Sequence, residues 1–256
     1  FMPFEKVQPE KLSHSVVRQI EQLILRGILV PGERLPSERD LSDRLGVSRP
    51  SLREAVAELV ERGLLETRPN AGIYVAPVLG AAFSPALVRL FAAHEEAVFD
   101  TISFRRDLEG MAAERAARYA SDTDLKVVDA IFRKMEAAHT KRDPSDEAEL
   151  DAAFHMAIIE ASHNVILLHM MRAMYDLLKQ GVFYNRQMMF RNRITRDTLL
   201  GQHRAIHAAL MLRNPEGARA AVAAHLDYVE RALTDQVRSE RHEDIARRRF
   251  EHEQAR

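Results

Sequence analysis

Apolar residues recur with the period of an α-helix along most of this chain, and strand-like segments are confined to one short region. Near the start, Leu12, Val16, Ile20 and Ile24 lie three or four residues apart. This spacing places them on one face of a helix. The pattern therefore predicts an amphipathic helix over residues 11–26.

Residues 41–54 have the pattern of a helix-turn-helix. Leu41 and Leu45 supply one apolar helix face, Gly46 permits a sharp turn, and Ser48 can cap a second helix. An ordinary helical hairpin with a solvated, charged face has the same pattern. This stretch alone therefore leaves both interpretations open.

A short hairpin is predicted directly after these helices. Gly63 can end the second helix, residues 64–68 and 73–75 have the composition of two strands, and residues 69–72 supply the turn between them. Two helices joined by a sharp turn and followed by such a wing are a more specific pattern than either part. We therefore expect a winged helix-turn-helix domain that binds double-stranded DNA.

Bulk charge does not favour DNA binding, although phosphate neutralisation usually dominates affinity for DNA. The formal net charge is -1, and residues 1–76 contain eleven Lys or Arg against eleven Asp or Glu. We therefore expect a local arginine face, and not the net charge, to bind the DNA. Ser51 lies between two of these arginines at the start of the second helix. The arginines that recur through the helix-turn-helix are Arg34, Arg39, Arg44, Arg49 and Arg53.

The rest of the chain is predicted to be helical, which makes the fold class mainly α. Residues 85–240 show helical periods separated by short breaks, one of them a polar stretch at 191–196, as in a bundle of six or seven helices. Proline, glycine and small residues mark 77–84 as the linker after a DNA-binding domain at 7–76. Residues 241–256 alternate in charge and are expected to be a solvated helical extension or disordered.

Composition narrows the class of protein. With 256 residues and 46% apolar residues, two domains can each bury a core. The absence of cysteine excludes disulfides and thiolate chemistry. No apolar run approaches the length of a membrane span and no signal peptide is evident, so we expect a soluble, cytoplasmic protein. Phe1 precedes Met2 and is expected to be the remnant of an expression tag.

Four side chains in the helical region are candidate metal ligands. Asp151 and His155 are four residues apart on one predicted helix, and His203 and His225 lie on two later helices against apolar backgrounds. One carboxylate and three imidazoles suit a divalent cation such as zinc. Because the chain has 11 histidines, satisfied core histidines or surface helix pairs are an open alternative. His207, four residues after His203, is left out because its partner is not evident.

The N-terminal region resembles a known family. Residues 31–39, 47–55 and 63–65 are similar to the GntR superfamily of bacterial transcription regulators. The helical region resembles the ligand-sensing domain of its FadR subfamily, in particular the pyruvate- and lactate-responsive branch, and the resemblance covers about residues 7–240. Relatives often have glycine at the wing tip, where this chain has Pro-Asn-Ala at 69–71, although asparagine tolerates a left-handed backbone.

The resemblance implies roles in DNA binding. Arg39, Arg49 and Arg53 match positions that contact DNA, with Ser48 and Ser51 near the phosphates. The implied assembly is a homodimer that binds a palindromic operator and represses transcription until an effector releases it.

The resemblance also implies a sensor. The four candidate ligands match the metal ligands of many subfamily members, which favours a divalent metal, above all zinc. Arg105 matches an arginine that points into the ligand cavity, where it could hold a 2-oxo or 2-hydroxy monocarboxylate such as pyruvate, lactate or glycolate. The alternative for Arg105 is an ion pair with Glu109, four residues later on the same helix.

Two other functions fit parts of the sequence. A metal-dependent hydrolase with an appended winged helix would use an open metal site, but the chain lacks His-Glu-x-x-His and Asp151 is better used as a ligand. A constitutive DNA-binding protein would need no sensor, and the near-neutral charge and expected pocket argue against it. The sequence therefore favours a ligand-responsive transcription regulator.

Overall fold

The chain folds into two compact units, residues 1–82 and 83–256, which are described separately. The computed structural model describes residues 11–78, 83–141, 143–184, 189–190 and 193–254. These ranges contain ten α-helices and one two-stranded sheet, so the predicted mainly α fold class is confirmed. Residues 79–82 of the expected linker lie outside the described residues.

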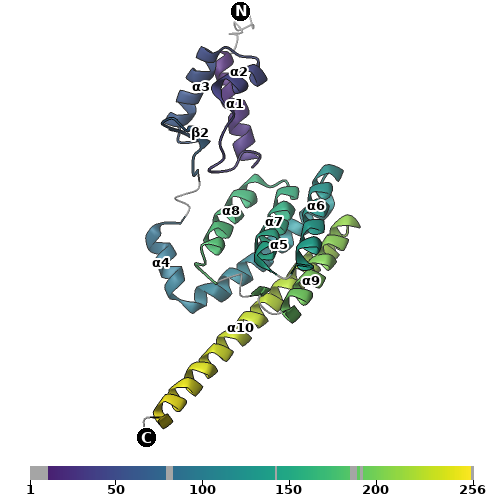
Figure 1. The fold of residues 1–256 in the computed structure, drawn as a ribbon. Helices are drawn as coiled ribbons and strands as arrows, with labels where there is room; N and C mark the ends of the chain where they lie inside the picture. Colours follow the sequence, from purple (N-terminus) through teal and green to yellow (C-terminus); the bar gives the residue numbers. More distant parts are fainter. Residues whose placement is uncertain (1–10, 79–82, 142, 185–188, 191–192, 255–256) are drawn as a thin grey trace, which may run out of the picture. The chain divides into compact units, whose positions relative to one another are not determined.

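The first unit is a winged helix-turn-helix, as predicted (Figure 1). Its elements are α1 (Leu12–Leu25), α2 (Glu38–Leu45), α3 (Arg49–Glu61), and the antiparallel strands β1 (Leu65–Arg68) and β2 (Gly72–Val75). Val16 and Ile20 of α1 pack with Leu52 and Leu59 of α3, each at most 3% exposed. The amphipathic first helix therefore covers the helix-turn-helix core.

Local hydrogen bonds define the helix ends in this unit. The Ser37 hydroxyl accepts from the Asp40 amide at 3.2 Å and donates to the Asp40 carboxylate at 2.7 Å. The Ser48 hydroxyl accepts from the Ser51 amide at 3.3 Å. Gly46 ends α2 with φ 66°, a left-handed conformation that glycine adopts without steric cost. The sharp turn between α2 and α3 follows from these residues.

The segment before α2 extends the hydrogen bonding of the wing, which the sequence pattern did not predict. The Leu35 amide donates to the Ile73 carbonyl and the Val75 amide to the Glu33 carbonyl, both at 2.9 Å. At the wing tip Asn70 has φ 56°, so the turn forms with a left-handed asparagine in place of the usual glycine.

The second unit is a bundle of helices (Figure 1). Its helices are α4 (Pro85–Ala93), α5 (Glu95–Tyr119), α6 (Asp122–His139), α7 (Ser145–Ala161), α8 (Val165–Lys179), α9 (Arg193–Met211) and α10 (Pro215–Gln254). Helix α5 packs against α7 and α10, and α6 packs against α7 and α9. Small buried residues of α5, such as Ala113 and Ala116, pack in one core with Ala218 and Val222 of α10 and allow the two helices to approach closely.

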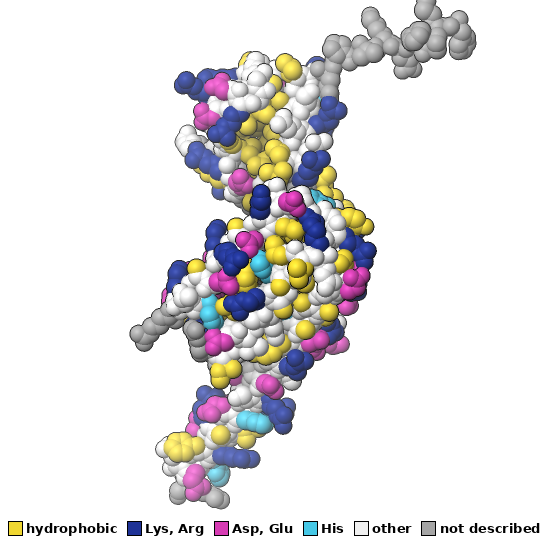
Figure 2. Space-filling view, turned by 90° about the vertical axis from the view of Figure 1, so that its right-hand side faces the viewer, with side chains coloured by type: hydrophobic (Ala, Val, Ile, Leu, Met, Phe, Trp, Pro, Cys, Tyr) yellow, Lys and Arg dark blue, Asp and Glu magenta, His cyan; other side chains and the backbone are white. Residues whose placement is uncertain are grey.

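Two boundaries refine the predictions for this unit. The break expected at 191–196 is wrong for its C-terminal part, because α9 begins at Arg193 and the polar side chain of Arg196 is satisfied inside the bundle. Helix α10 continues to Gln254, so the described part of 241–256 is a helical extension, on which side chains of both charges alternate (Figure 2). None of the helices in the described ranges has the length and apolar character needed to cross a bilayer.

Candidate metal centre and nucleic-acid interface

Four buried side chains from three helices of the second unit meet at one point. Asp151 and His155 lie one turn apart on α7, His203 is on α9, and His225 is on α10. Each residue is at most 5% exposed, and one candidate ligand atom from each lies within 4.8 Å of the other three. The structure thus brings together the four residues that the sequence singled out. His207 is not among them and pairs with a carboxylate on α6.

The nitrogen and oxygen atoms of this cluster are closely spaced. Asp151 Oδ1 lies 2.9 Å from His203 Nε2 and 3.7 Å from His155 Nε2, and the two Nε2 atoms are 3.3 Å apart. The ring centroid of His225 lies 4.5 Å from that of His203 and 5.1 Å from that of His155. Two imidazole nitrogens therefore face one carboxylate oxygen, with the third ring beside them.

Polar groups outside the cluster orient two of its rings. Glu109 Oε2 lies 2.7 Å from His155 Nδ1, and Gln202 Oε1 lies 2.9 Å from His225 Nδ1. An acceptor at Nδ1 favours the tautomer that has its lone pair on Nε2. Both rings are therefore arranged to offer Nε2 as a ligand atom.

Arg105 lies beside this cluster in a buried ion-pair network. Its Nε donates to Glu109 Oε1 at 2.7 Å, and its terminal nitrogens donate to the hydroxyls of Tyr175 and Tyr184 at 2.9 Å each. The Tyr175 hydroxyl donates to Glu109 Oε1 at 2.9 Å. Burial raises the pKa of Glu109, but Arg105 and His155 together hold this pKa far below its usual range. Burial lowers the pKa of Arg105, but Glu109 keeps it well above the usual value, so both groups are charged.

In the first unit, three of the arginines expected to bind DNA lie on the two helices of the helix-turn-helix. Arg39 on α2 and Arg49 on α3 are exposed. Arg53, one turn after Arg49, is also exposed, and its Nε donates to Glu38 Oε2 at 2.9 Å across the two helices. An exposed arginine at the start of a recognition helix can contact base edges or phosphates in the major groove.

The other expected residues lie at the start of α3 and beside the wing. The Ser48 and Ser51 hydroxyls are 2.9 Å apart at the N-terminus of α3, where backbone N–H groups favour a phosphate. Ser51 is half-buried rather than fully exposed. Arg34 packs over Gly72, where a Cβ atom would lie 3.2 Å from Arg34 Nε. Arg34 therefore belongs to the wing and not to the recognition helix.

Comparison with known proteins gives the family. Residues 12–75 match the bacterial regulatory proteins of the gntR family, and residues 100–228 match the FCD domain. The chain is 35% identical over 231 residues to the regulatory protein assigned to the L-lactate dehydrogenase operon of Escherichia coli, covering 89% of this chain and 88% of that protein. The chain belongs to the gntR family. It is also 34% identical to the Glc operon transcriptional activator of Escherichia coli, with 86% and 88% of the two chains covered. Its identity to the HTH-type transcriptional regulator LutR of Bacillus subtilis is 30%, with 83% and 96% covered.

Membership of the gntR family makes this chain a DNA-binding transcription regulator. The resemblance stated from the sequence is therefore confirmed, including the sensor-type domain in the second half. The FCD match contains Arg105 and all four residues of the buried cluster. The relatives are regulators and not enzymes, so the metal-dependent hydrolase is set aside.

Several residues of this gntR-family site were not predicted from sequence. Glu109 was expected only as an alternative partner of Arg105, and its approach to His155 on another helix was not foreseen. Gln202, Tyr175 and Tyr184 were not singled out at all. No spacing rule connects residues on different helices, so the sequence held no direct indication of these contacts.

Proposed function

We propose that this regulator senses a small carboxylate through a divalent metal ion held by Asp151, His155, His203 and His225. The buried convergence of these side chains from three helices carries the proposal. In this assignment the 2.7 Å contact of Glu109 Oε2 with His155 Nδ1 holds the ring in its ligand orientation, and carboxylates at this position are common beside metal-bound histidines.

The distances within the cluster suit a divalent cation. Zinc bonds to nitrogen and oxygen are about 2.0–2.2 Å, so two ligand atoms of one ion stand about 2.8–3.6 Å apart. The observed separations of 2.9 and 3.3 Å lie within this range, and the separation of 3.7 Å lies just above it. Imidazole and carboxylate ligands suit zinc, which is the metal we assign. When bound, the ion would supply a Lewis-acidic position for one effector oxygen.

The assigned effector is a 2-oxo or 2-hydroxy monocarboxylate such as pyruvate, lactate or glycolate. Among the described residues, Arg105 uses three of its five N–H groups for Glu109, Tyr175 and Tyr184, which leaves two for a carboxylate. Arginine binds carboxylates through such paired N–H groups. The relative named for the L-lactate dehydrogenase operon supports an acid of this class.

DNA binding is assigned to the helix-turn-helix and the wing. The residues assigned to this contact are Arg34, Arg39, Ser48, Arg49, Ser51 and Arg53. A homodimer formed through the helical unit would present two recognition helices to a palindromic operator. We assign a repressor whose operator affinity falls when the effector binds, which requires that the effector bind the two arrangements with different affinity.

The domain boundaries that we assign follow the same division of roles. Residues 7–76 bind operator DNA, 77–84 form the linker, 85–240 sense the effector and dimerise, and 241–256 form a charged extension. The division into compact units at residue 82 supports these limits. We place the regulator in the bacterial cytoplasm, where its operator lies.

Elemental analysis tests the metal site. About one metal ion per subunit is expected in the purified chain, and none in the His155→Ala, His203→Ala double variant. Zinc at a thousand times its dissociation constant should stabilise the parent by about 4 kcal/mol, seen as a higher thermal midpoint. His207→Ala is the matched control, since it removes a histidine of α9 that lies outside the cluster. A folded parent that holds no metal after loading contradicts the metal site but not the family.

Calorimetry of the zinc-loaded chain tests the effector. Lactate, pyruvate or glycolate should bind the parent and should bind Arg105→Met much more weakly. The same acid should raise the dissociation constant for operator DNA, measured by fluorescence anisotropy at fixed salt. Binding of none of the three acids would contradict the effector class.

A further inference from the structure

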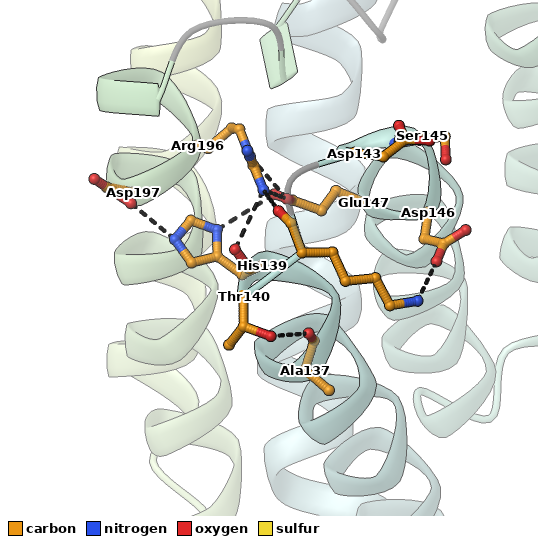
Figure 3. A network of polar contacts seen from close by, with 10 residues as sticks. Ala137, His139, Thr140, Asp143, Ser145, Asp146, Glu147, Arg196 and Asp197 are labelled. Atoms are coloured by element: carbon orange, nitrogen blue, oxygen red, sulfur yellow. Dashed lines mark hydrogen bonds and ion pairs between the residues drawn. The ribbon is translucent and has the colours of Figure 1, made fainter.

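Outside the metal cluster, Arg196 of α9 joins the ends of three helices (Figure 3). Its Nε donates to Glu147 Oε1 at 2.8 Å. A terminal nitrogen donates to the same oxygen and to the backbone carbonyls of His139 and Lys141, at 3.2 and 3.1 Å. Glu147 lies in the first turn of α7, and His139 is the last residue of α6. One guanidinium therefore connects the C-terminus of α6 to the start of α7 and α9.

The Arg196–Glu147 pair is buried and held from several sides. Each side chain is 7% exposed. A carboxylate in the first turn of one helix and a cation at the last carbonyls of another both complement the helix dipoles. His139 contacts the other carboxylate oxygen of Glu147, with Nδ1 3.4 Å from Oε2, and its Nε2 lies 2.7 Å from Asp197 Oδ1. These contacts fix the guanidinium in one place, unlike a solvated surface pair.

This pair shares two helices with the metal cluster. Glu147, Asp151 and His155 follow each other at intervals of four residues and so lie on one face of α7. Arg196 lies seven residues, about two turns, before His203 on α9. The contact of 2.9 Å between Asp151 Oδ1 and His203 Nε2 is therefore a second bridge between the same helices. Helix α6 packs against both of them.

We propose that Arg196 and Glu147 are positioning residues for the metal site. Their ion pair holds the start of α9 at a fixed distance from α7, and thereby places His203 where one ion can also reach Asp151. Metal–ligand distances tolerate deviations of about 0.2 Å, so a small displacement of α9 weakens binding. This inference rests on the proposed metal site and deepens it, because Arg196 and Glu147 would act on the proposed ligands through the placement of α7 and α9.

The zinc dissociation constant, measured against a competing chelator on the full chain, tests the proposal. Arg196→Met should weaken zinc binding about tenfold, as losses of supporting contacts around metal ligands do. Arg213→Met is the matched control. Arg213 follows α9 at its other end, donating to the Ala120 carbonyl at 2.8 Å and to Asp122 at 2.7 Å, and its loss should leave zinc affinity unchanged. Arg196→Lys keeps the charge but not the forked donors, and should be intermediate.

A double variant separates positioning from stability. Replacing a buried ion pair by two apolar side chains is often neutral for folding, so Arg196→Met, Glu147→Met should unfold near the parent's midpoint without metal. Its zinc affinity should still be reduced, and its cobalt complex should show a changed visible spectrum. Parent-like affinity and spectrum in this variant and in Arg196→Met would overturn the inference. A parent that binds no zinc would overturn the metal site as well.

Discussion

Replacing Arg105 and Glu109 together should destabilise the helical unit by clearly less than the sum of the two single replacements. Each side chain is 2% exposed, and their contact distance is 2.7 Å. In Arg105→Met a carboxylate remains buried without its cation, and in Glu109→Met a guanidinium remains buried without its anion. Removing one partner of a buried pair typically costs about 3–5 kcal/mol, mostly because the remaining charge is uncompensated.

The double variant Arg105→Met, Glu109→Met leaves no buried charge of the pair. Its main cost is the loss of partners for the hydroxyls of Tyr175 and Tyr184, about 1–3 kcal/mol for each buried group. Independent effects would give about 6–10 kcal/mol for the double variant, whereas the structure predicts about 2–6 kcal/mol. The difference is the coupling energy of the pair, and a double-mutant cycle measures it directly.

The assay is urea unfolding with a chelator present, so that metal binding does not contribute. The chain contains no tryptophan, and circular dichroism therefore reports the helices. Hydrogen exchange of peptides from α5 and α7 isolates the second unit. Arg106→Met is the control, because Arg106 pairs with Asp227 at 34% and 39% exposure and solvent screening limits its effect to less than about 1 kcal/mol. A double variant whose loss equals the sum of the single losses would refute the coupling.

Three further predictions concern other parts of the chain. Burial raises the pKa of Asp124, but hydrogen bonding to Ser121 lowers it by more, so the folded pKa lies below the unfolded value of about 4. The stabilisation from the Asp124 carboxylate is therefore present above about pH 4 and is lost as the pH falls through the folded pKa. Asp124→Asn should make the thermal midpoint less dependent on pH in this acid range and cost about 1 kcal/mol at pH 7. Gly72→Ala should cost about 1–3 kcal/mol and reduce amide protection in the wing, because Gly72 has φ +110° and the new Cβ would lie 3.2 Å from Arg34 Nε. Leu52→Ala should destabilise the first unit by about 3 kcal/mol, since Leu52 is 0% exposed, while hydrogen exchange in the second unit stays unchanged.

Features set by neighbouring residues could be predicted from the sequence. Ser37, Ser48 and Ser121 begin helices because a short hydroxyl can accept a backbone N–H two or three residues later. Asp151 and His155 could be placed on one helix face because four residues make about one turn. His203 and His225 could be singled out by their apolar backgrounds, and the family resemblance favoured them over the other histidines of the chain. No spacing rule relates residues on different helices, so only the structure shows that His203 and His225 meet Asp151 and His155.

Features that join separate elements could not be predicted. The spacing of four residues predicts the contact of Glu109 with Arg105 on the same helix. It does not predict the second contact of Glu109, with His155 on α7. Arg196 lies in a polar stretch that predicted a break between helices. In the structure the residue is only 6% exposed and donates to Glu147. In the sequence, a buried arginine cannot be distinguished from an exposed one. Only the packing of three helix ends distinguishes them.

In the proposed function, the contacts of Glu109 would also let the metal ion and the effector influence each other's binding. Glu109 contacts both Arg105 and His155, so the proposed carboxylate on the arginine and the proposed ion on the histidine would act on one shared group. An effector that drew Arg105 away from Glu109 would change the contact between Glu109 Oε2 and His155 Nδ1. Coupling of binding free energies is reciprocal, so any factor by which zinc strengthened effector binding would equal the factor by which the effector strengthened zinc binding. Unequal factors would mean that a third equilibrium, such as dimer association, contributes to one of the two measurements.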